Sequence, residues 1–264
     1  MQRSSEILQA GTGNQTVKLF AGLNRSRAVR EKNGAFALEG SRLVLDALQT
    51  GVKLRAVLLT EKAKAQHYAA LRDAAPDTKM LQISDQQAKE IADTETAQGV
   101  FAVAEMLPER DLMPQAGDRA MLLHCLQDPS NLGAILRTAE ALGTDGLYLY
   151  QCCDLYNPKV IRGSMGAIFR APIRRIRDTD AFFAHCRSAR VPVCAAVVDR
   201  DAVLLGQYDF SCGGVVLIGN EGNGLPREVS DCCDVKLTIP MSLASNSLNA
   251  AMAAGLFLWE MAKT

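Results

Sequence analysis

Long apolar runs recur along the second half of the chain, and helical segments lie between most of them. The apolar residues of each run follow one another instead of alternating with polar residues. That pattern indicates strands that are buried on both faces, and therefore a mostly parallel sheet. The runs occupy residues 120–126, 146–150, 191–198, 213–219 and 235–240.

The first half of the chain shows a shorter alternation of strands and helices. Strand-like runs at residues 34–40, 54–60 and 99–106 enclose helical segments at 41–51 and 61–75. Because each kind of element needs the other to bury its apolar face, this alternation predicts a small α/β sandwich.

Residues 107–118, LPERDLMPQAGD, interrupt both patterns with two prolines, one glycine and four charged residues. Such a composition is typical of a linker. We therefore predict an α/β protein with an amino-terminal domain at residues 1–107, a linker at 108–118 and a carboxy-terminal domain at 119–264.

Charge and length narrow the class of protein. The 264-residue chain carries 29 basic and 29 acidic residues, so its formal net charge is zero. This balance excludes a uniformly basic surface, although it allows local basic patches for nucleic acid. The longest uncharged apolar run, residues 250–259, has half the length of a membrane span, and the first twenty residues lack the apolar region of a secretory signal. We expect a soluble, cytoplasmic protein that does not bind membranes.

The cysteines and histidines do not indicate a metal site. Two adjacent cysteine pairs, at residues 152–153 and 232–233, are unlike a secreted disulfide framework, and the chain has no C-x-x-C spacing. We interpret the eight cysteines as reduced structural thiols. His124 lies inside an apolar run, so we predict a core residue with satisfied ring nitrogens.

Polar loops follow three of the predicted strands. In parallel sheets, ligands bind beyond the carboxyl ends of the strands, so these loops are candidates for one site. The loop within residues 215–226 contains glycines spaced G-x-x-G-x-G, with Glu221 among them. Dinucleotide-binding and Walker loops have other spacings, and a carboxylate would repel phosphate. The loop is therefore not a phosphate cradle, which disfavours a nucleotide-dependent oxidoreductase.

The other two loops open helices. In residues 128–143 an apolar stripe predicts a helix that Asp128 or Ser130 caps. Asn131 and Arg137 stand about 9 Å apart along that helix, so we expect them to contact different parts of one extended substrate and not a single atom. Residues 245–260 predict a second helix, rich in small side chains, with Ser247 and Asn249 at its start. Taken alone, each segment has an ordinary structural explanation. Asn131, Ser247 and Asn249 would be polar residues at the start of a helix, and Arg137 would be a solvated side chain.

Together the three segments resemble the ordered motifs of the SpoU, or TrmH, family of RNA 2′-O-methyltransferases. The stretches that carry the resemblance are NLGAILRTAEALG, LIGNEGNGL and IPMSLASNSLNAAMAAG, and NPKVIRGSMGAIFRAPI resembles the family sequence between the first and second motifs. The resemblance covers residues 119–264. The first half, with FALEGSRLVLDAL, resembles a ribosomal-protein-like RNA-binding domain.

The resemblance implies a deep trefoil knot, a homodimer formed through the carboxy-terminal domain, and S-adenosylmethionine as cofactor. It also implies the site residues. The catalytic set that matches the motifs is Asn131, Arg137, Glu221, Ser247 and Asn249, and the cofactor-binding set is Gly219, Ile239, Met241 and Leu248.

Several roles within this set stay open. A guanidinium is a poor base because its pKa lies above about 12. We therefore interpret Arg137 as a clamp on the phosphate beside the target ribose, with that phosphate or a water taking the proton. Glu221 either orients Asn131 or polar groups of the substrate, or pairs with Arg137, or only stabilises its loop. We expect Ser247 and Asn249 to orient the hydroxyl and to fix the loop above the cofactor.

Two arginine-rich stretches, residues 24–32 and 169–177, predict contacts with RNA phosphates on this neutral chain. We expect ribosomal RNA as the substrate; the alternatives are a tRNA 2′-O-methyltransferase and a non-catalytic RNA-binding or ribosome-assembly protein. The predicted RNA-binding residues are Arg25, Arg27, Arg30, Lys159, Arg162 and Arg170.

Overall fold

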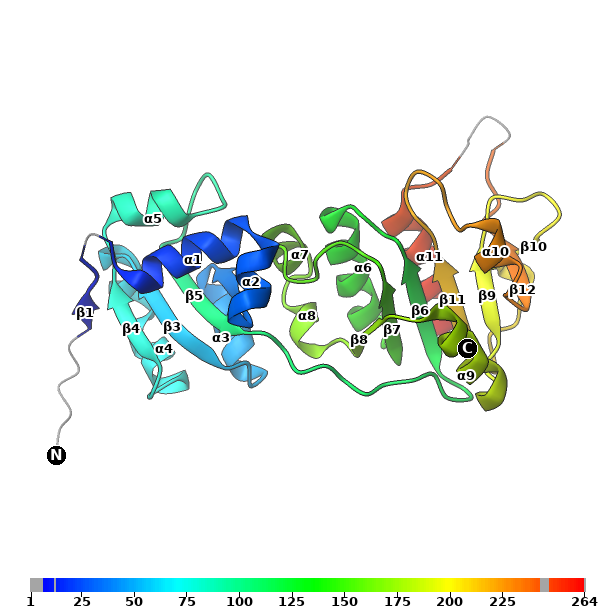
Figure 1. Cartoon of the computed structure of the whole chain (residues 1–264), viewed down its shortest axis with the longest axis horizontal. Coiled ribbons are helices and arrows are strands. Elements are labelled where there is room, and N and C mark those ends of the chain that lie inside the picture. Colours follow the sequence, from blue (N-terminus) through cyan, green and yellow to red (C-terminus); the bar gives the residue numbers. More distant parts are fainter. Residues whose placement is uncertain (1–6, 12, 243–246, 264) are drawn as a thin grey trace. The chain divides into compact units, whose positions relative to one another are not determined.

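The chain forms two compact units in the computed structural model, which describes residues 7–11, 13–242 and 247–263. We call them the amino-terminal and the carboxy-terminal unit (Figure 1). The amino-terminal unit comprises Met1–Leu107 and Tyr156–Phe169, and the carboxy-terminal unit comprises Pro108–Leu155 and Arg170–Thr264.

The amino-terminal unit contains a mixed sheet of five strands in the order β1-β4-β3-β5-β2. β5 pairs antiparallel with both of its neighbours, whereas β4 pairs parallel with β1 and β3. The α/β architecture predicted for this half is therefore observed. The strands are β1 (Leu8–Gln9), β2 (Ala35–Glu39), β3 (Leu54–Leu59), β4 (Lys79–Gln82) and β5 (Val100–Glu105).

Five helices accompany this sheet, and their apolar positions form its core. The first buries Val17, Phe20 and Leu23, and the ring of Phe20 meets Phe101 of β5 edge to face at 5.3 Å. The helices are α1 (Gln15–Arg25), α2 (Arg27–Asn33), α3 (Ser41–Gln49), α4 (Glu61–Ala74) and α5 (Asp85–Ile91).

A segment from the middle of the sequence also packs with the amino-terminal unit. It carries α7 (Pro158–Gly163) and the start of α8 (Ala167–Arg170). The Tyr156 ring lies 4.8 Å from the ring of Phe36, and its hydroxyl accepts a hydrogen bond from the Leu107 N–H at 3.0 Å. The compact units therefore differ from the predicted contiguous domains, whose boundaries stay a prediction.

The carboxy-terminal unit is built on a sheet of seven strands in the order β10-β12-β9-β11-β6-β7-β8, and every pairing in it is parallel. The mostly parallel sheet predicted from the continuous apolar runs is confirmed. Its strands are β6 (Arg119–His124), β7 (Gly146–Tyr150), β8 (Ile173–Ile176), β9 (Val193–Ala196), β10 (Val203–Leu204), β11 (Gly214–Ile218) and β12 (Val235–Thr238).

Two helices of this unit start at the predicted polar loops and pack against each other. Asp128 caps α6 by accepting the N–H of Ser130 at 2.8 Å, and Pro129 occupies the first helical position, where it costs no hydrogen bond. Asn249 caps α11. The helices are α6 (Pro129–Ala141), α9 (Thr179–Ala189), α10 (Arg227–Ser230) and α11 (Ala250–Ala262), with a short 3₁₀ turn η1 (Leu205–Gln207).

The residues predicted as a linker are held along the edge strand β8. Arg174 pairs with Asp111 at 2.9 Å and donates to the Leu112 carbonyl at 2.8 Å. Arg175 pairs with Glu109 at 2.7 Å. These acids neutralise two arginines of the stretch that we expected to bind RNA, and they cover a strand that pairs with only one neighbour.

Among the described residues, no helix is both long enough and apolar enough to pass through a membrane.

Candidate active site

Three loops converge at the carboxyl edge of the parallel sheet. β6 and β11 are neighbours in the sheet, and β12 is separated from β11 by β9. The loops that follow β6, β11 and β12 line an open pocket of about 680 Å³. Its lining residues are Gln127, Asp128, Asn131, Asn220, Glu221, Ser247, Leu248, Asn249 and Ala250.

A chain of hydrogen bonds joins the three loops. Asn131 donates its side-chain N–H to Glu221 Oε1 at 3.2 Å, and Asn131 Oδ1 accepts from Asn249 Nδ2 at 2.9 Å. Asn249 Oδ1 accepts the N–H groups of Ala251 and Met252 at 2.9 and 3.2 Å. The chain therefore runs in one direction, from the amino-terminal end of α11 to the Glu221 carboxylate.

Glu221 is held by more donors than Asn131 alone. Its two oxygens accept the backbone N–H groups of Gln127 at 3.1 Å and of Asp128 at 2.8 Å. Partial burial raises the pKa of Glu221, but these hydrogen bonds outweigh it and hold the pKa below its ordinary value. The carboxylate is thus charged at neutral pH. Of its open roles, the geometry favours orienting Asn131.

The loop that carries Glu221 is a closed turn. Asn220 and Gly224 exchange both backbone hydrogen bonds, at 3.0 and 2.9 Å. The Asn220 side chain accepts the N–H of Gly222 at 2.9 Å and donates to the Cys125 carbonyl at 2.9 Å. A Cβ on Gly219 would lie 2.2 Å from the carbonyl carbon of Gly224, so only glycine fits beneath this turn.

Arg137 is the one member of the predicted catalytic set outside the pocket lining. Its side chain is exposed on α6, and it has no hydrogen-bond or ion-pair partner among the described residues. The neighbouring Thr138 approaches Gly255 of α11. The structure therefore brings together Asn131, Glu221, Ser247 and Asn249, and leaves the Arg137 side chain exposed on α6, outside the pocket lining.

Four lining residues are outside the set predicted from the sequence: the apolar Ala250 and three polar residues. Gln127, Asp128 and Asn220 each precede a predicted site residue by one to four positions. The sequence predicts Asp128 as a helix cap only. The signal that could have found them is their place at the strand ends, because every residue of such a short loop faces the same edge of the sheet.

The pocket lining is acidic, because Asp128 and Glu221 are its two charged residues. A thiol lies near both carboxylates: burial first, and then the charges of Glu221, Asp154 and Asp128, raise the pKa of Cys153 to about 11. Cys153 is therefore a neutral thiol at physiological pH, which agrees with the predicted structural thiols.

His124, at the end of β6, is buried and stacks on Tyr150 with ring centroids 5.0 Å apart. Burial lowers its pKa. Its Nδ1 has no partner among the described residues, so the prediction of a satisfied core histidine is correct for burial only.

The described residues contain no group of three or more metal-ligating side chains.

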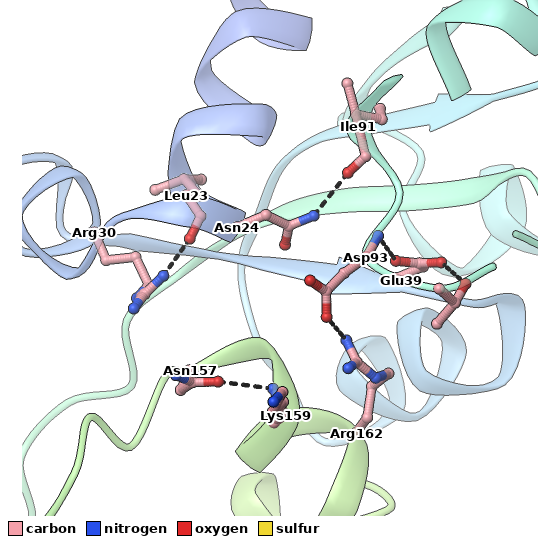
Figure 2. Close-up of polar contacts among 10 residues, drawn as sticks. Leu23, Asn24, Arg30, Glu39, Ile91, Asp93, Asn157, Lys159 and Arg162 are labelled. Carbon is pink, nitrogen blue, oxygen red and sulfur yellow. Dashed lines mark hydrogen bonds and ion pairs between the residues drawn. The ribbon is translucent and has the colours of Figure 1, made fainter. Parts of the chain in front are cut away.

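One predicted RNA-binding residue is buried. Arg30 is 3% exposed, and it donates a hydrogen bond to the Leu23 carbonyl inside the amino-terminal unit (Figure 2). A buried guanidinium cannot reach a phosphate in solvent, so its assignment as an RNA contact is wrong. The sequence did not indicate this burial, because the neighbouring arginines are exposed. On a helix such as α2, one residue in three or four faces the core, and here that residue is Arg30.

The other predicted RNA-binding residues lie nearer the surface. Figure 2 shows Asp93 between Glu39, which accepts its N–H at 2.9 Å, and Arg162, which forms an ion pair with its carboxylate. The Lys159 side chain is exposed, while its N–H bonds to Asn157 at 2.9 Å. Of the rest, Arg25 donates to the Glu90 carbonyl, Arg27 pairs with Glu31, and Arg170 pairs with Glu140.

Sequence profiles agree with this geometry. The profile of the SpoU rRNA Methylase family matches residues 118–259. The chain belongs to the SpoU rRNA methylase family. A profile described as an MRM3-like substrate binding domain matches residues 14–102 of this SpoU protein.

Relatives match along nearly the whole length of the chain. The 23S rRNA (guanosine(2553)-2′-O)-methyltransferase RlmP of Bacillus subtilis is 27% identical over 249 residues, which cover 94% of this chain and 96% of the relative. The AdoMet-bound rRNA methyltransferase from Sinorhizobium meliloti is 30% identical with a TM-score of 0.85, covering 98% of this chain and 97% of that one. The SpoU methyltransferase AviRb from Streptomyces viridochromogenes, also with AdoMet, has a TM-score of 0.84 at 27% identity, covering 95% and 97%.

SpoU methyltransferases use S-adenosylmethionine, and the site of this SpoU protein fits that cofactor. The acidic lining favours a cationic sulfonium over a phosphate. The absence of a side chain at Gly219 lets a ligand approach the backbone closely. When bound, the cofactor supplies an activated methyl group.

Two of the predicted cofactor residues come directly after the strands on either side of β9. Gly219 comes directly after β11 and Ile239 directly after β12. The strand β9 lies between these two, and the Val197 N–H beyond its end donates to the Leu237 carbonyl at 2.9 Å. Met241 follows Ile239 and is half-buried, and Leu248 lines the pocket. Residues 243–246 of the third motif lie outside the described residues.

Proposed function

We propose that this SpoU-family enzyme transfers a methyl group from S-adenosylmethionine to a ribose 2′-hydroxyl in ribosomal RNA. The hydrogen-bond chain from α11 through Asn249 and Asn131 to Glu221 carries the proposal. These hydrogen bonds join the loops after three strands into one rigid polar surface. An enzyme that aligns two substrates requires such a fixed surface. The relatives named as 23S rRNA 2′-O-methyltransferases support ribosomal RNA as the substrate.

In this mechanism the side chains bind and orient. Asn131 has both of its amide groups engaged, so its plane cannot rotate, and the Asn249 plane is fixed in the same way. Ser247 lies beside them in the pocket with a hydroxyl that both donates and accepts, and it would orient the ribose hydroxyl. The backbone around Gly219, Ile239 and Leu248 would hold the cofactor.

Arg137 would clamp the phosphate beside the target ribose. The charged residues of the pocket lining are acidic, so RNA phosphates must be neutralised from outside it. Arg137 is exposed and has no partner among the described residues. Its guanidinium is therefore available to bind a phosphate.

RNA recognition would rest on Arg25, Arg27, Lys159, Arg162 and Arg170. Most of these arginines pair with exposed or half-exposed groups of the protein, and surface ion pairs contribute only about 0–1 kcal/mol. Phosphates can therefore replace the carboxylates at little cost. The affinity for RNA should fall steeply as salt rises.

A methylation assay tests the function. Ribosomal RNA and tRNA are incubated with the protein and labelled S-adenosylmethionine, and 2′-O-methylation is mapped across both. We expect label at one ribose of ribosomal RNA, and none in an oligonucleotide with 2′-deoxyribose at that position, because it lacks the acceptor. Label in tRNA alone would show that the protein is a tRNA 2′-O-methyltransferase. Cofactor binding without transfer would indicate a non-catalytic RNA-binding protein.

We also propose that two copies associate through the exposed face of α11. Met252, Leu256 and Trp259 recur at helical spacing on this helix and are 64%, 39% and 55% exposed, and Leu248 just before it is 40% exposed. Monomers rarely expose a contiguous apolar surface of this kind. The same face of a second copy would bury this apolar surface in a symmetric dimer.

Replacing Trp259 by glutamate tests the dimer. Light scattering after size exclusion should give twice 28.5 kDa for the wild type and a single 28.5 kDa chain for Trp259→Glu. Leu8→Glu is the matched control, because Leu8 is 65% exposed, at least as much as Trp259, but lies in the amino-terminal unit, and this variant should stay dimeric. A dimeric Trp259→Glu or a monomeric wild type would contradict this interface.

A further inference from the structure

A ribose hydroxyl must lose its proton when it is methylated, and most acceptors of the pocket are already occupied. The Asn131, Asn249 and Asn220 side-chain oxygens each accept an N–H group. Glu221 accepts from two backbone N–H groups and from Asn131, and its pKa lies below its ordinary value. None of these four groups is a suitable proton acceptor.

Gln127 and Ser247 do not fill the gap. Both N–H bonds of the Gln127 amide are directed at carbonyls, those of Cys125 at 3.2 Å and Gln151 at 2.9 Å. Its remaining oxygen can accept a hydrogen bond but does not bind a proton at neutral pH. A serine hydroxyl is likewise no base unless another base assists it.

Asp128 differs from the other lining residues. Its Oδ1 caps α6 by accepting the Ser130 N–H at 2.8 Å, whereas its Oδ2 has no partner among the described residues. Its backbone N–H donates to Glu221 Oε1 at 2.8 Å, which fixes the residue in the lining of the pocket. It is therefore an ionisable group of the lining with a free oxygen.

We propose that Asp128 is a catalytic residue whose free carboxylate oxygen takes the proton of the 2′-hydroxyl; this rests on the proposed function. The O–H bond of the hydroxyl breaks, and its proton passes to Oδ2. The hydroxyl oxygen forms the bond to the methyl carbon, and the electron pair of the sulfur–methyl bond goes to the sulfur. The products are the 2′-O-methyl ribose, a neutral thioether and a protonated Asp128, which returns the proton to solvent.

Asp128→Asn separates this role from helix capping, because asparagine caps helices as well as aspartate does. We expect kcat to fall about a hundredfold to ten-thousandfold, the usual contribution of a positioned base. The KM for RNA and the Kd for S-adenosylmethionine, the latter from calorimetry, should change less than about threefold, since the pocket keeps its shape. The midpoint of thermal unfolding should not fall.

The pH profile gives a second readout. The titratable groups near Asp128 include Glu221, which stays charged, and Cys153, whose pKa burial and the charges of Glu221, Asp154 and Asp128 raise to about 11. From about pH 7 to about pH 9, the wild-type kcat should be nearly constant. The residual kcat of Asp128→Asn should rise about tenfold per pH unit, because hydroxide then replaces the carboxylate.

Asp128→Ser keeps a capping hydroxyl without a carboxylate and should show the same loss. The proposal is overturned if Asp128→Asn keeps kcat within about threefold of the wild type, or if its kcat falls only together with cofactor affinity and unfolding temperature. A wild-type protein that methylates no RNA would instead refute the proposed function, so the two failures are distinguishable.

Discussion

Replacing Glu221 by glutamine is expected to lower kcat about fivefold to a hundred-and-fiftyfold, while the protein stays folded. The carboxylate accepts N–H groups from Gln127, Asp128 and Asn131. A glutamine would turn its own NH₂ towards at least one of these donors and leave it without an acceptor, which costs about 1–3 kcal/mol when bound RNA and cofactor exclude water from the site. The loss of this acceptor should also disturb Asn249 and the cap of α11. Asn131 is oriented by its bond to Glu221, and Asn249 in turn by its bond to Asn131.

The measurement is single-turnover methylation of the RNA identified by the mapping assay. Glu228→Gln is the matched control, since Glu228 is exposed on α10 and should leave kcat unchanged. A Glu221→Gln enzyme with wild-type kcat would show that Glu221 serves only its own loop.

The same carboxylate gives the site a pH dependence. The folded state holds the pKa of Glu221 below its ordinary value of 4.5, so its contribution to stability is fully present above that pH and is lost as the pH falls through the folded value. The difference in unfolding temperature between the wild type and Glu221→Gln should therefore shrink in acid. A difference that stays constant down to about pH 3 would contradict the shift.

Gly219→Ala should abolish cofactor binding and lower the free energy of unfolding by about 1–3 kcal/mol. The added Cβ would lie 2.2 Å from the Gly224 carbonyl carbon and 2.3 Å from the Leu225 nitrogen. Both atoms belong to the backbone, so no side-chain rotation relieves the overlap, and the closed turn must open. Opening it displaces Glu221 and with it the wall of the pocket.

Calorimetry with S-adenosylmethionine and thermal unfolding check this result. Gly222→Ala is a control three residues along the same turn. The nearest atom to its added Cβ is Asn220 Oδ1 at 3.5 Å, an ordinary contact, so this variant should bind the cofactor like the wild type. If Gly219→Ala binds as tightly as Gly222→Ala, the close approach at Gly219 has no role in cofactor binding.

Strands with buried apolar runs could be predicted from the sequence because burial on both faces leaves a local pattern. The run at 213–219 became β11 (Gly214–Ile218), and the run at 146–150 became β7 (Gly146–Tyr150). The edge strand β8 could not be found in this way. Its sequence, IRRI, places two arginines in a four-residue strand, and these are neutralised by acids from the 108–118 segment.

The candidate site was predictable as a set of polar loops but not as a geometry. The motifs identified Asn131, Glu221, Ser247 and Asn249, which do line one pocket. They did not indicate that Asp128 has one occupied and one free carboxylate oxygen, or that Arg30 is buried. Those properties depend on which way a side chain turns within its element, and neighbouring residues in the sequence do not determine this.

The sequence by itself determined the class of fold, the positions of the buried strands and the three loops at their carboxyl ends, because apolar period and glycine spacing are properties of short stretches. Only the tertiary structure decided that Glu221 anchors Asn131 and Asp128, and that Tyr156–Phe169 packs with the amino-terminal unit. The reason is physical: Glu221 and Asn131 are 90 residues apart in the chain, and a hydrogen bond between them exists only after parallel strands have aligned their ends.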